Sequence, residues 1–323
     1  MAKILVTGGA GFIGATLTRA LLDRGDDVVI IDDFNDRYDP QLKEARIAAL
    51  LPNFPAELLI RQNVTNQEAV NEVFKTHTFD SVIHLAAWAA VQRSIDEPLI
   101  YSRSNVDGTV VMLEAARKHK VKNFVFASSS SVYGGRETMP LTENDDVSRP
   151  ISPYAATKVA GEALCATWNY LYGLPISALR FFTVYGPWGR PEMALFTFAE
   201  AIRTGQPIEM RGKNTKRDFT YIDDIVSGII GALDHPNGYQ IYNLGNHDAV
   251  ELPRFIRAIE ESLGKKAQIR EVPLPPGDIP ITLADITKAQ SDLGYAPTTN
   301  IEEGVEKAMQ WYTDVYVPRF IAN

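Results

Sequence analysis

The chain has 323 residues and a formal net charge of −8. This length is sufficient for one large domain with a smaller lobe attached. Its acidic balance argues against nucleic acid or an anionic membrane as a partner. A hydrophobic fraction of 45% and a charged fraction of 22% are ordinary for a globular protein, and no apolar run reaches the ~18 residues of a membrane span. The single cysteine, Cys165, excludes an internal disulfide and a multi-cysteine metal site, so we expect no bound metal and interpret Cys165 as buried helix packing.

The chain opens with the pattern of a strand, a glycine turn and a helix. Residues 3–7 form a short apolar run, Gly8, Gly11 and Gly14 follow, and residues 12–21 carry apolar side chains at helical spacing. In such a unit the glycines permit a tight turn, close approach of a pyrophosphate and close helix packing, while the helix N-terminus offers free N–H groups to the anion. The start lacks the basic region and cleavage site of a signal peptide, so we expect a cytoplasmic protein.

A second strand supports a dinucleotide cofactor. Residues 27–31 are apolar and end in Asp32, about twenty residues after the glycine turn, where a carboxylate accepts hydrogen bonds from the adenosine ribose hydroxyls. The same carboxylate would repel a 2′-phosphate. The sequence therefore favours NAD over NADP.

The glycine spacing after Thr7 resembles the extended branch of the short-chain dehydrogenase/reductase superfamily, the NAD-dependent sugar-nucleotide epimerases and dehydratases. The resemblance implies an α/β fold, with a Rossmann-type doubly wound parallel sheet over residues 1–182 that binds NAD. It also implies a smaller mixed α/β substrate-binding lobe over 183–323, from which residues of about 217–245 return to the cofactor domain. The implied NAD contacts are Gly8, Gly11, Phe12, Ile13, Gly14, Asp32, Asn35, Asn63, Val64, Leu85, Ala86, Ala87, Asn105, Tyr154 and Lys158.

Two of these segments need comment. Asn63 stands where the family usually has an aspartate that contacts adenine, and its side-chain carbonyl could still accept from the adenine amine. Residues 82–87 are apolar and predict the next buried strand, within which we interpret His84 as a packed core histidine.

A proton-transfer group follows the next predicted strand. An apolar run over 124–127 leads into Ser129, and Tyr154 and Lys158 come 25 and 29 residues later. Positions i and i+4 share one face of a helix, so Tyr154 and Lys158 point the same way. A nearby ammonium and the positive nicotinamide ring both favour the phenolate, which lets a tyrosine take a hydroxyl proton at neutral pH. We therefore predict Tyr154, Lys158 and Ser129 as the catalytic residues.

The residues after Ser129 narrow the reaction. Dehydratases and decarboxylases of this family carry acidic residues where this chain has Ser130 and Ser131. The resemblance implies that the cofactor oxidises the sugar at C4. Without that acid and base, the hydride can only return to C4. Its return to the opposite face of the sugar gives the 4-epimer.

The segment from Arg180 to Ala194 indicates the substrate. Its Thr183 replaces the asparagine of glucose/galactose-type epimerases, and the segment resembles the UDP-glucuronate 4-epimerases. The resemblance implies reversible, NAD-dependent conversion of UDP-glucuronate to UDP-galacturonate through a 4-keto sugar. The predicted contacts to the UDP-sugar are Ser129, Ser130, Ser131, Thr183, Arg190, Met193, Arg217 and Asp278.

Related enzymes dimerise through helices equivalent to 99–118 and 154–172, so we expect a homodimer. Two alternatives remain open: a 4-epimerase of a neutral UDP-hexose such as UDP-glucose or UDP-galactose, and a non-catalytic NAD-binding sensor. Gln92, which replaces an arginine of the relatives, bears on pocket polarity in either case.

Overall fold

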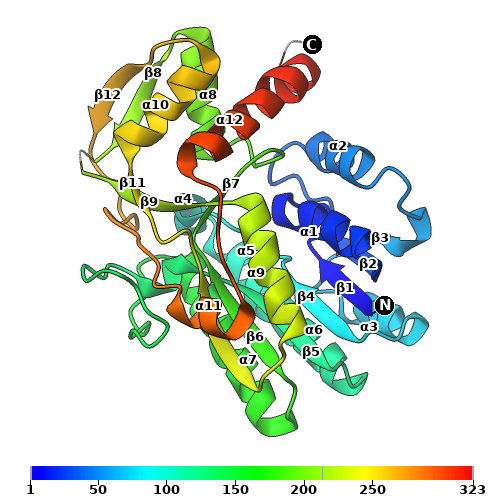
Figure 1. The fold of residues 1–323 in the computed structure, drawn as a ribbon. Coiled ribbons are helices and arrows are strands. Elements are labelled where there is room, and N and C mark those ends of the chain that lie inside the picture. The colour runs from blue at the N-terminus through cyan, green and yellow to red at the C-terminus, as the bar shows by residue number, and fades with distance from the viewer. Residues whose placement is uncertain (1, 213, 322–323) are drawn as a thin grey trace.

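A seven-stranded parallel sheet forms the centre of the computed structural model, which describes residues 2–212 and 214–321 (Figure 1). Its strand order is β10-β6-β5-β4-β1-β2-β3, and all six neighbouring pairs run parallel. The strands are β1 Lys3–Thr7, β2 Asp27–Asp32, β3 Leu59–Arg61, β4 Ser81–His84, β5 Asn123–Ser129, β6 Ile176–Phe181 and β10 Tyr239–Leu244. This order confirms the predicted doubly wound Rossmann-type sheet.

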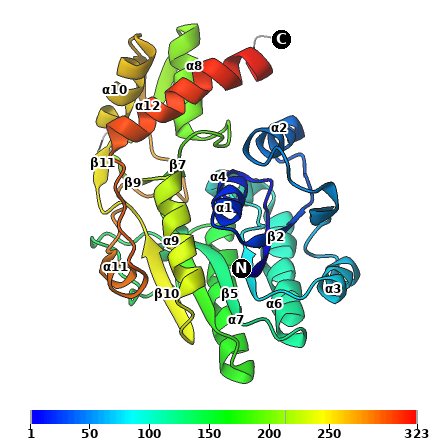
Figure 2. The same ribbon diagram turned by 45° about the vertical axis from the view of Figure 1, so that its right-hand side comes forward.

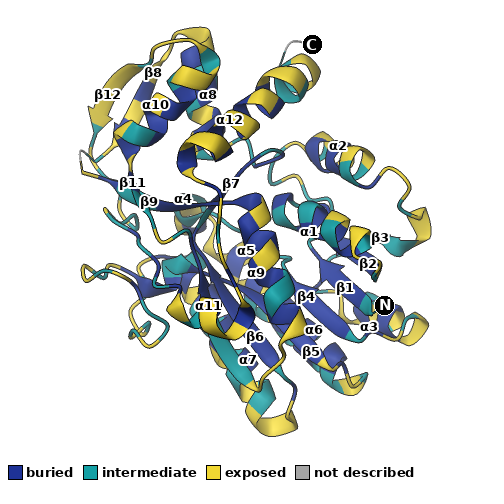
Figure 3. Cartoon of the chain, in the orientation of Figure 1, coloured by how far each residue is buried: buried dark blue, intermediate teal, exposed yellow. Residues whose placement is uncertain are grey.

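Each face of the sheet is covered by helices because successive strand side chains point to opposite faces. In β1, Ile4 and Val6 enter one apolar core and Leu5 enters the other. On the first face lie α1 (Phe12–Asp23) and α9 (Ile222–Asp234), which contact each other (Figure 2). On the second face lie α3 (Gln67–Thr76), α6 (Gly108–Lys118) and α7 (Pro153–Tyr172). Most residues of the central strands are buried, and many of the exposed residues lie on outer helix surfaces and loops (Figure 3).

The helical stretch expected over 99–118 is a chain of three segments. It begins as α5 (Pro98–Ser102), continues as a five-residue π-helix over Arg103–Asp107, and ends as α6. Short α4 (Val91–Asp96) precedes it. Within the described ranges, no helix combines the length and apolarity that crossing a membrane requires.

Most of the C-terminal half forms a smaller lobe above the carboxyl ends of the strands (Figure 1). Its sheets are β11-β9-β7 and β12-β8. Its elements are β7 Thr183–Tyr185, α8 Ala194–Thr204, β8 Pro207–Arg211, β9 Lys216–Tyr221, β11 Ala249–Glu251, α10 Leu252–Leu263, β12 Gln268–Val272, α12 Ile301–Trp311 and the π-helix Tyr312–Ile321. Two segments of this half belong to the larger domain. Helix α9 packs on the central sheet, and β10 joins that sheet beside β6. The remaining helices are α2 Pro40–Leu50 and α11 Thr287–Leu293.

The strand order reverses direction at the neighbouring strands β1 and β4, and such a switch point leaves a crevice beyond the strand ends. The strand expected over 82–87 ends earlier, at His84. Leu85 still donates its N–H to the Thr7 carbonyl oxygen at 3.2 Å, but β1 itself ends at Thr7. Beyond β1, residues 85–87 leave the sheet and form a wall of the crevice.

Candidate active site

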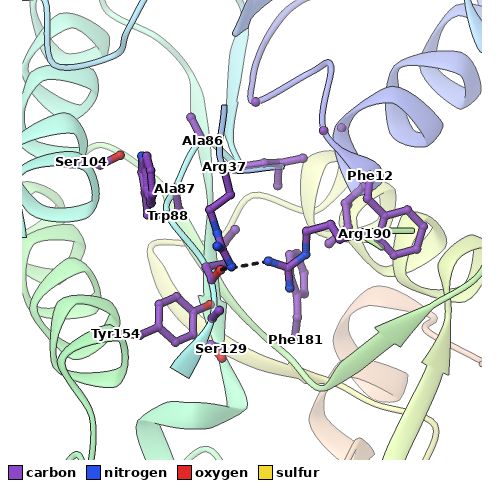
Figure 4. A pocket seen from close by; sticks show the side chains of 18 of the residues that line it. Phe12, Arg37, Ala86, Ala87, Trp88, Ser104, Ser129, Tyr154, Phe181 and Arg190 are labelled. Carbon is purple, nitrogen blue, oxygen red and sulfur yellow. Dashed lines mark hydrogen bonds between the residues drawn. The ribbon is translucent and has the colours of Figure 1, made fainter. Parts of the chain in front are cut away.

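A cleft of about 390 Å³ occupies the crevice and is lined by most of the predicted cofactor and substrate residues (Figure 4). Among the residues predicted from the sequence, those on its walls are Gly8, Gly11, Phe12, Ile13, Gly14, Asp32, Asn35, Asn63, Val64, Leu85, Ala86, Ala87, Ser129, Ser130, Ser131, Tyr154, Lys158, Thr183, Arg190 and Met193. They come from the carboxyl ends of the central strands, from the loops that follow them, and from α1, α7 and β7.

The glycine turn packs so closely against neighbouring backbone that Gly8 and Gly14 leave no room for a side chain. Gly8 has φ +71°, and a Cβ added there would lie 2.9 Å from the Ala86 backbone nitrogen. A Cβ on Gly14 would lie 2.2 Å from the Gly8 carbonyl oxygen, so helix α1 can approach the turn only with glycine at this position. Helix α1 then begins at Phe12 with its N-terminus facing the cleft. Free N–H groups at a helix start suit a pyrophosphate, so the turn fits a dinucleotide.

The Asp32 carboxylate, buried at the end of β2, already has three donors. It accepts from the backbone N–H groups of Ala10 at 3.1 Å and Phe34 at 2.9 Å, and from the Lys43 ammonium at 3.0 Å. A carboxylate has about four acceptor positions, so one remains for a ribose hydroxyl. Lys43, on α2, also lines the cleft and is a site residue that the sequence analysis missed. Its spacing eleven residues after Asp32 carries no motif that would have identified it.

At the same end of the cleft, Asn35 and Asn63 are joined through Asp33. Both side-chain amides donate to the Asp33 carboxylate, at 2.6 Å from Asn35 and 2.8 Å from Asn63. The Asn63 side-chain carbonyl accepts from the Thr65 N–H at 2.9 Å and from its hydroxyl at 2.8 Å. Both lone pairs of that oxygen are therefore engaged within the protein, which leaves Asp33, rather than Asn63, with acceptor capacity beside the cleft.

Asn105 lies behind the cleft wall. Its side-chain oxygen accepts from the Trp88 N–H at 2.8 Å, and its amide donates to the Trp88 carbonyl at 2.9 Å and to the Thr157 hydroxyl at 3.0 Å. Asn105 belongs to the π-helical segment and is 2% exposed. It thus fixes the loop after β4 against α7, and it reaches a ligand only through the residues that it holds.

The three predicted catalytic residues all line the cleft. Figure 4 shows the side chains of Ser129 and Tyr154 close together. Tyr154 stands at the start of α7, and its ring packs edge-on against Tyr101 with centroids 6.2 Å apart. This enclosed position raises the pKa of the Tyr154 phenol, while a hydrogen-bonding interaction with Ser129 and the charge of Arg190 partly offset the rise. Ser129 ends β5, and its oxygen accepts from the Ser131 N–H at 3.1 Å.

Lys158 is one helical turn further along α7 and is 4% exposed. Its ammonium donates to the Ala127 carbonyl oxygen at 2.7 Å and lies 5.9 Å from the centre of the Tyr154 ring. Burial lowers the pKa of Lys158 to about 8, against the opposing influence of Cys165 and Glu162. The ammonium is thus held in place by the end of β5 on the side of the tyrosine.

Polar groups buried beneath the cleft make contacts within the protein that stabilise the fold. His84 meets the Thr7 hydroxyl through Nδ1 at 2.7 Å, and burial lowers its pKa to about 3, so the ring is neutral. Burial raises the pKa of the Cys165 thiol well above its usual value. Arg180 donates to both carboxylate oxygens of Glu162, at 2.9 and 2.8 Å.

Two arginines meet above this group. Arg37, from the loop after β2, and Arg190, from the loop after β7, both donate to the Ala89 carbonyl oxygen, at 3.0 and 2.9 Å. Both also lie near the Glu192 carboxylate, at 3.3 and 3.4 Å. Figure 4 shows the two side chains pointing toward one another. One carboxylate for two guanidinium groups leaves this part of the cleft positive. Arg37 was missed because its partners are 52 and 155 residues away along the chain.

A smaller cavity continues from the cleft and contains the remaining predicted substrate residues. Ser130, Ser131 and Thr183 line both cavities, while Arg217 and Asp278 line only the smaller one. Arg217 donates to the Asp278 carboxylate at 2.9 Å. Burial lowers the pKa of Arg217, and Asp278 opposes that effect.

The loop that carries Asp278 is tethered from the other side. Gln92, on α4, donates its amide to the Pro276 carbonyl oxygen at 3.0 Å. The Gln92 side chain thus contacts the loop that carries Asp278 without lining the smaller cavity itself. Among the described residues, no group of three or more His, Cys, Asp or Glu side chains is placed to hold a metal ion.

Comparison with known proteins agrees with this geometry. Residues 4–245 match the model of the NAD dependent epimerase/dehydratase family. UDP-glucuronate 4-epimerase 1 of Arabidopsis thaliana is 43% identical over 333 residues, covering 97% of this chain and 77% of the relative.

Two solved structures are similar over nearly the whole chain. The UDP-glucuronic acid 4-epimerase of Bacillus cereus, in complex with UDP-glucuronic acid and NAD, superimposes with a TM-score of 0.90 at 34% identity, covering 97% of this chain and 100% of that one. The UDP-glucose 4-epimerase of Thermotoga maritima, with UDP-glucose, has a TM-score of 0.86 at 28% identity, covering 97% and 99%. Sheet, cleft and relatives agree: the chain is an NAD-using enzyme that belongs to the NAD dependent epimerase/dehydratase family.

Proposed function

We propose that this enzyme interconverts UDP-glucuronate and UDP-galacturonate by oxidation and reduction at C4 of the sugar. The observation that carries the proposal is the convergence of Ser129, Tyr154 and Lys158 beside a cofactor cleft whose sugar end is lined by neutral hydroxyls and arginine. The relatives named as UDP-glucuronate 4-epimerases support the choice of substrate.

In the proposed mechanism, Tyr154 takes the proton of the sugar 4-hydroxyl and later returns it. Lys158 favours the phenolate electrostatically, and Ser129 orients the hydroxyl by a hydrogen bond. NAD held at the glycine turn and Asp32 would supply the hydride chemistry at C4. The protein must hold the diphosphate while the sugar turns over, and Arg217 in the smaller cavity offers a planar fork for that anion.

The distribution of carboxylates favours epimerisation over elimination. Among the described residues that line the two cavities, the carboxylates are Asp32 and Asp33 at the β2 end and Asp278 in its ion pair with Arg217. A dehydratase needs an acid and a base near C5 and C6, and hydroxyls occupy the corresponding positions Ser130 and Ser131. The hydride therefore has C4 as its only acceptor.

The sugar carboxylate needs several donors. Ser130, Ser131 and Thr183 form a hydroxyl cluster at the junction of the two cavities, and Arg190 brings a positive charge to the same region. Hydroxyl donors can hold a carboxylate in more than one orientation, which suits a ring that must rotate between oxidation and reduction.

The test is NMR of the purified protein with UDP-glucuronate and NAD, following the coupling of the sugar H4. Appearance of UDP-galacturonate supports the proposal. UDP-pentose with carbon dioxide would indicate a decarboxylase, and turnover of UDP-galactose without turnover of UDP-glucuronate would establish a neutral-hexose epimerase. Tyr154→Phe is the matched control: it removes one oxygen, so it should bind UDP-glucuronate and leave it unchanged.

We also propose a homodimer that packs α5–α6 and α7 against their copies. The support is exposed apolar surface on this side of the molecule: Leu99 is 83% exposed, Ile95 45% and Tyr170 88%. Leu99→Glu should convert the dimer to a monomer in sedimentation or light scattering, because a buried unpaired charge opposes association. A monomeric wild type would overturn this assignment and leave the proposed reaction intact.

A further inference from the structure

Arg46 is a fully buried arginine whose hydrogen bonds go to neutral oxygens. It lies on α2 at 0% exposure. In the described part of the chain, its guanidinium donates to the carbonyl oxygens of Trp188 at 2.8 Å, Ala10 at 3.4 Å and Gly189 at 3.3 Å, and to the Tyr38 hydroxyl at 2.5 Å. Burial lowers its pKa, partly offset by Tyr38 and Asp32. Burying a cation costs free energy unless the cation is hydrogen-bonded. The role of Arg46 is therefore defined by the groups to which it donates.

On one side Arg46 holds the cofactor turn. Ala10 sits inside the glycine turn, and its peptide groups are fixed from both ends. Its N–H donates to the Asp32 carboxylate and its carbonyl accepts from Arg46. The residue that follows Ala10, Gly11, precedes the start of helix α1, where the dinucleotide pyrophosphate is expected. Any ligand that fixes this turn therefore also fixes an acceptor of Arg46.

On the other side Arg46 holds the 186–193 loop, the segment between β7 and α8. Trp188 has φ +63°, a left-handed conformation that is strained for a residue other than glycine. Its carbonyl is the acceptor of the shortest of the three carbonyl bonds from Arg46, and its ring packs against Trp311 of α12 with centroids 5.1 Å apart. The same loop carries Arg190 and Met193 into the cleft.

We propose that Arg46 is a positioning residue that couples occupation of the cofactor turn to the placement of the 186–193 loop, and so of Arg190 and Met193. The inference rests on the proposed function for the identity of the sugar nucleotide. Without Arg46, the carbonyls of Trp188 and Gly189 lose their donor, and a buried polar group left unpaired is destabilising. The strained Trp188 backbone then relaxes, and the loop no longer responds to the cofactor.

Coupling between two sites is reciprocal and is measured as a change in affinity. We would measure the NAD dissociation constant by calorimetry with and without saturating UDP-glucuronate, in the Tyr154→Phe background to prevent turnover. Coupling of this kind typically amounts to about 5–150-fold. We expect it to fall below about threefold in Arg46→Met, while Arg46→Lys, which keeps the charge without the fork, retains an intermediate value. Arg19→Met on α1, which removes an exposed arginine, is the matched control and should retain the full coupling.

A second measurement needs no sugar nucleotide. NAD should slow amide hydrogen exchange in the 186–193 peptide when Arg46 is present and leave it unchanged in Arg46→Met. Failure of UDP-glucuronate to bind the Tyr154→Phe protein would contradict the proposed function, and the exchange experiment would then decide the role of Arg46 alone. The inference is overturned if NAD still protects the loop in Arg46→Met. If the methionine variant does not fold, full protection of the loop in Arg46→Lys overturns the inference instead.

Discussion

The Lys158 ammonium lies 5.9 Å from the centre of the Tyr154 ring while its hydrogen bond goes to the Ala127 carbonyl oxygen at 2.7 Å. In the proposed mechanism the lysine therefore acts on the tyrosine through its charge, and β5 fixes where that charge lies. An effect that depends on charge must disappear when the ammonium loses its proton.

Replacing Lys158 by methionine should therefore lower kcat on the order of 10²-fold or more, within the range that a positioned proton-transfer group contributes. Because the pKa of Lys158 is about 8, the wild-type rate should decline above that pH as the ammonium is lost. The residual activity of Lys158→Met should lack this alkaline decline. Steady-state rates between pH 6 and 10 provide the check, and an identical alkaline limb in both proteins would assign it to another group.

Thr183→Ala should weaken control of the sugar carboxylate. Oxidation of glucuronate at C4 gives a β-keto acid, which loses carbon dioxide when the carboxylate bond aligns with the carbonyl π system. With one hydroxyl fewer at the cavity junction, we expect a higher KM and the appearance of carbon dioxide and UDP-pentose. Product analysis by NMR measures both, and a variant that merely epimerises more slowly would argue against this role of Thr183.

His84 should make stability depend on pH. Its folded pKa of about 3 lies below its unfolded value of 6.5. Below pH 6.5 the unfolded chain binds a proton that the folded protein excludes, so this contribution to stability is complete above pH 6.5 and is lost as the pH falls toward 3. The free energy of unfolding of His84→Gln should therefore change less between pH 6.5 and 4 than that of the wild type. Parallel curves from urea denaturation would contradict the prediction.

Ala90→Gly should stabilise the protein. Ala90 has φ +147°, a backbone conformation that glycine adopts without strain. Strain in such a region costs about 1–3 kcal/mol, whereas glycine loses roughly 0.5–1 kcal/mol in chain entropy. We expect a net gain of about 1 kcal/mol in thermal unfolding. Ala89→Gly, at a neighbouring position without positive φ, serves as control and should be destabilising.

The parts of the site that the sequence predicted are those encoded by short spacings. The glycine turn, Asp32 at the end of β2, and the Tyr154 and Lys158 pair all follow from strand or helix periodicity. Lys43, Arg46 and Arg37 could not be found in this way. Lys43 follows its partner Asp32 by eleven residues without a recognisable motif. Arg37 and Arg46 contact the turn after β1 and the loops after β4 and β7, and only the folded chain brings these segments together.

Asn105 shows the opposite limit. The family resemblance assigned it to the cofactor, and the fold directs its side chain to the Trp88 backbone and Thr157 instead. A local turn of π-helix, which no periodicity in the sequence signals, sets that direction.

The return of β10 to the central sheet limits how this chain can be divided or recombined. Because β10 pairs with β6 along six residues, a fragment that ends at residue 182 would expose the unpaired edge of β6, and a fragment that starts at 183 would carry β10 without its neighbour. The substrate lobe therefore cannot be exchanged between relatives as a cassette. A change of sugar specificity therefore has to be made by single substitutions in the intact chain. Each substitution must leave the fold of the cofactor domain unchanged.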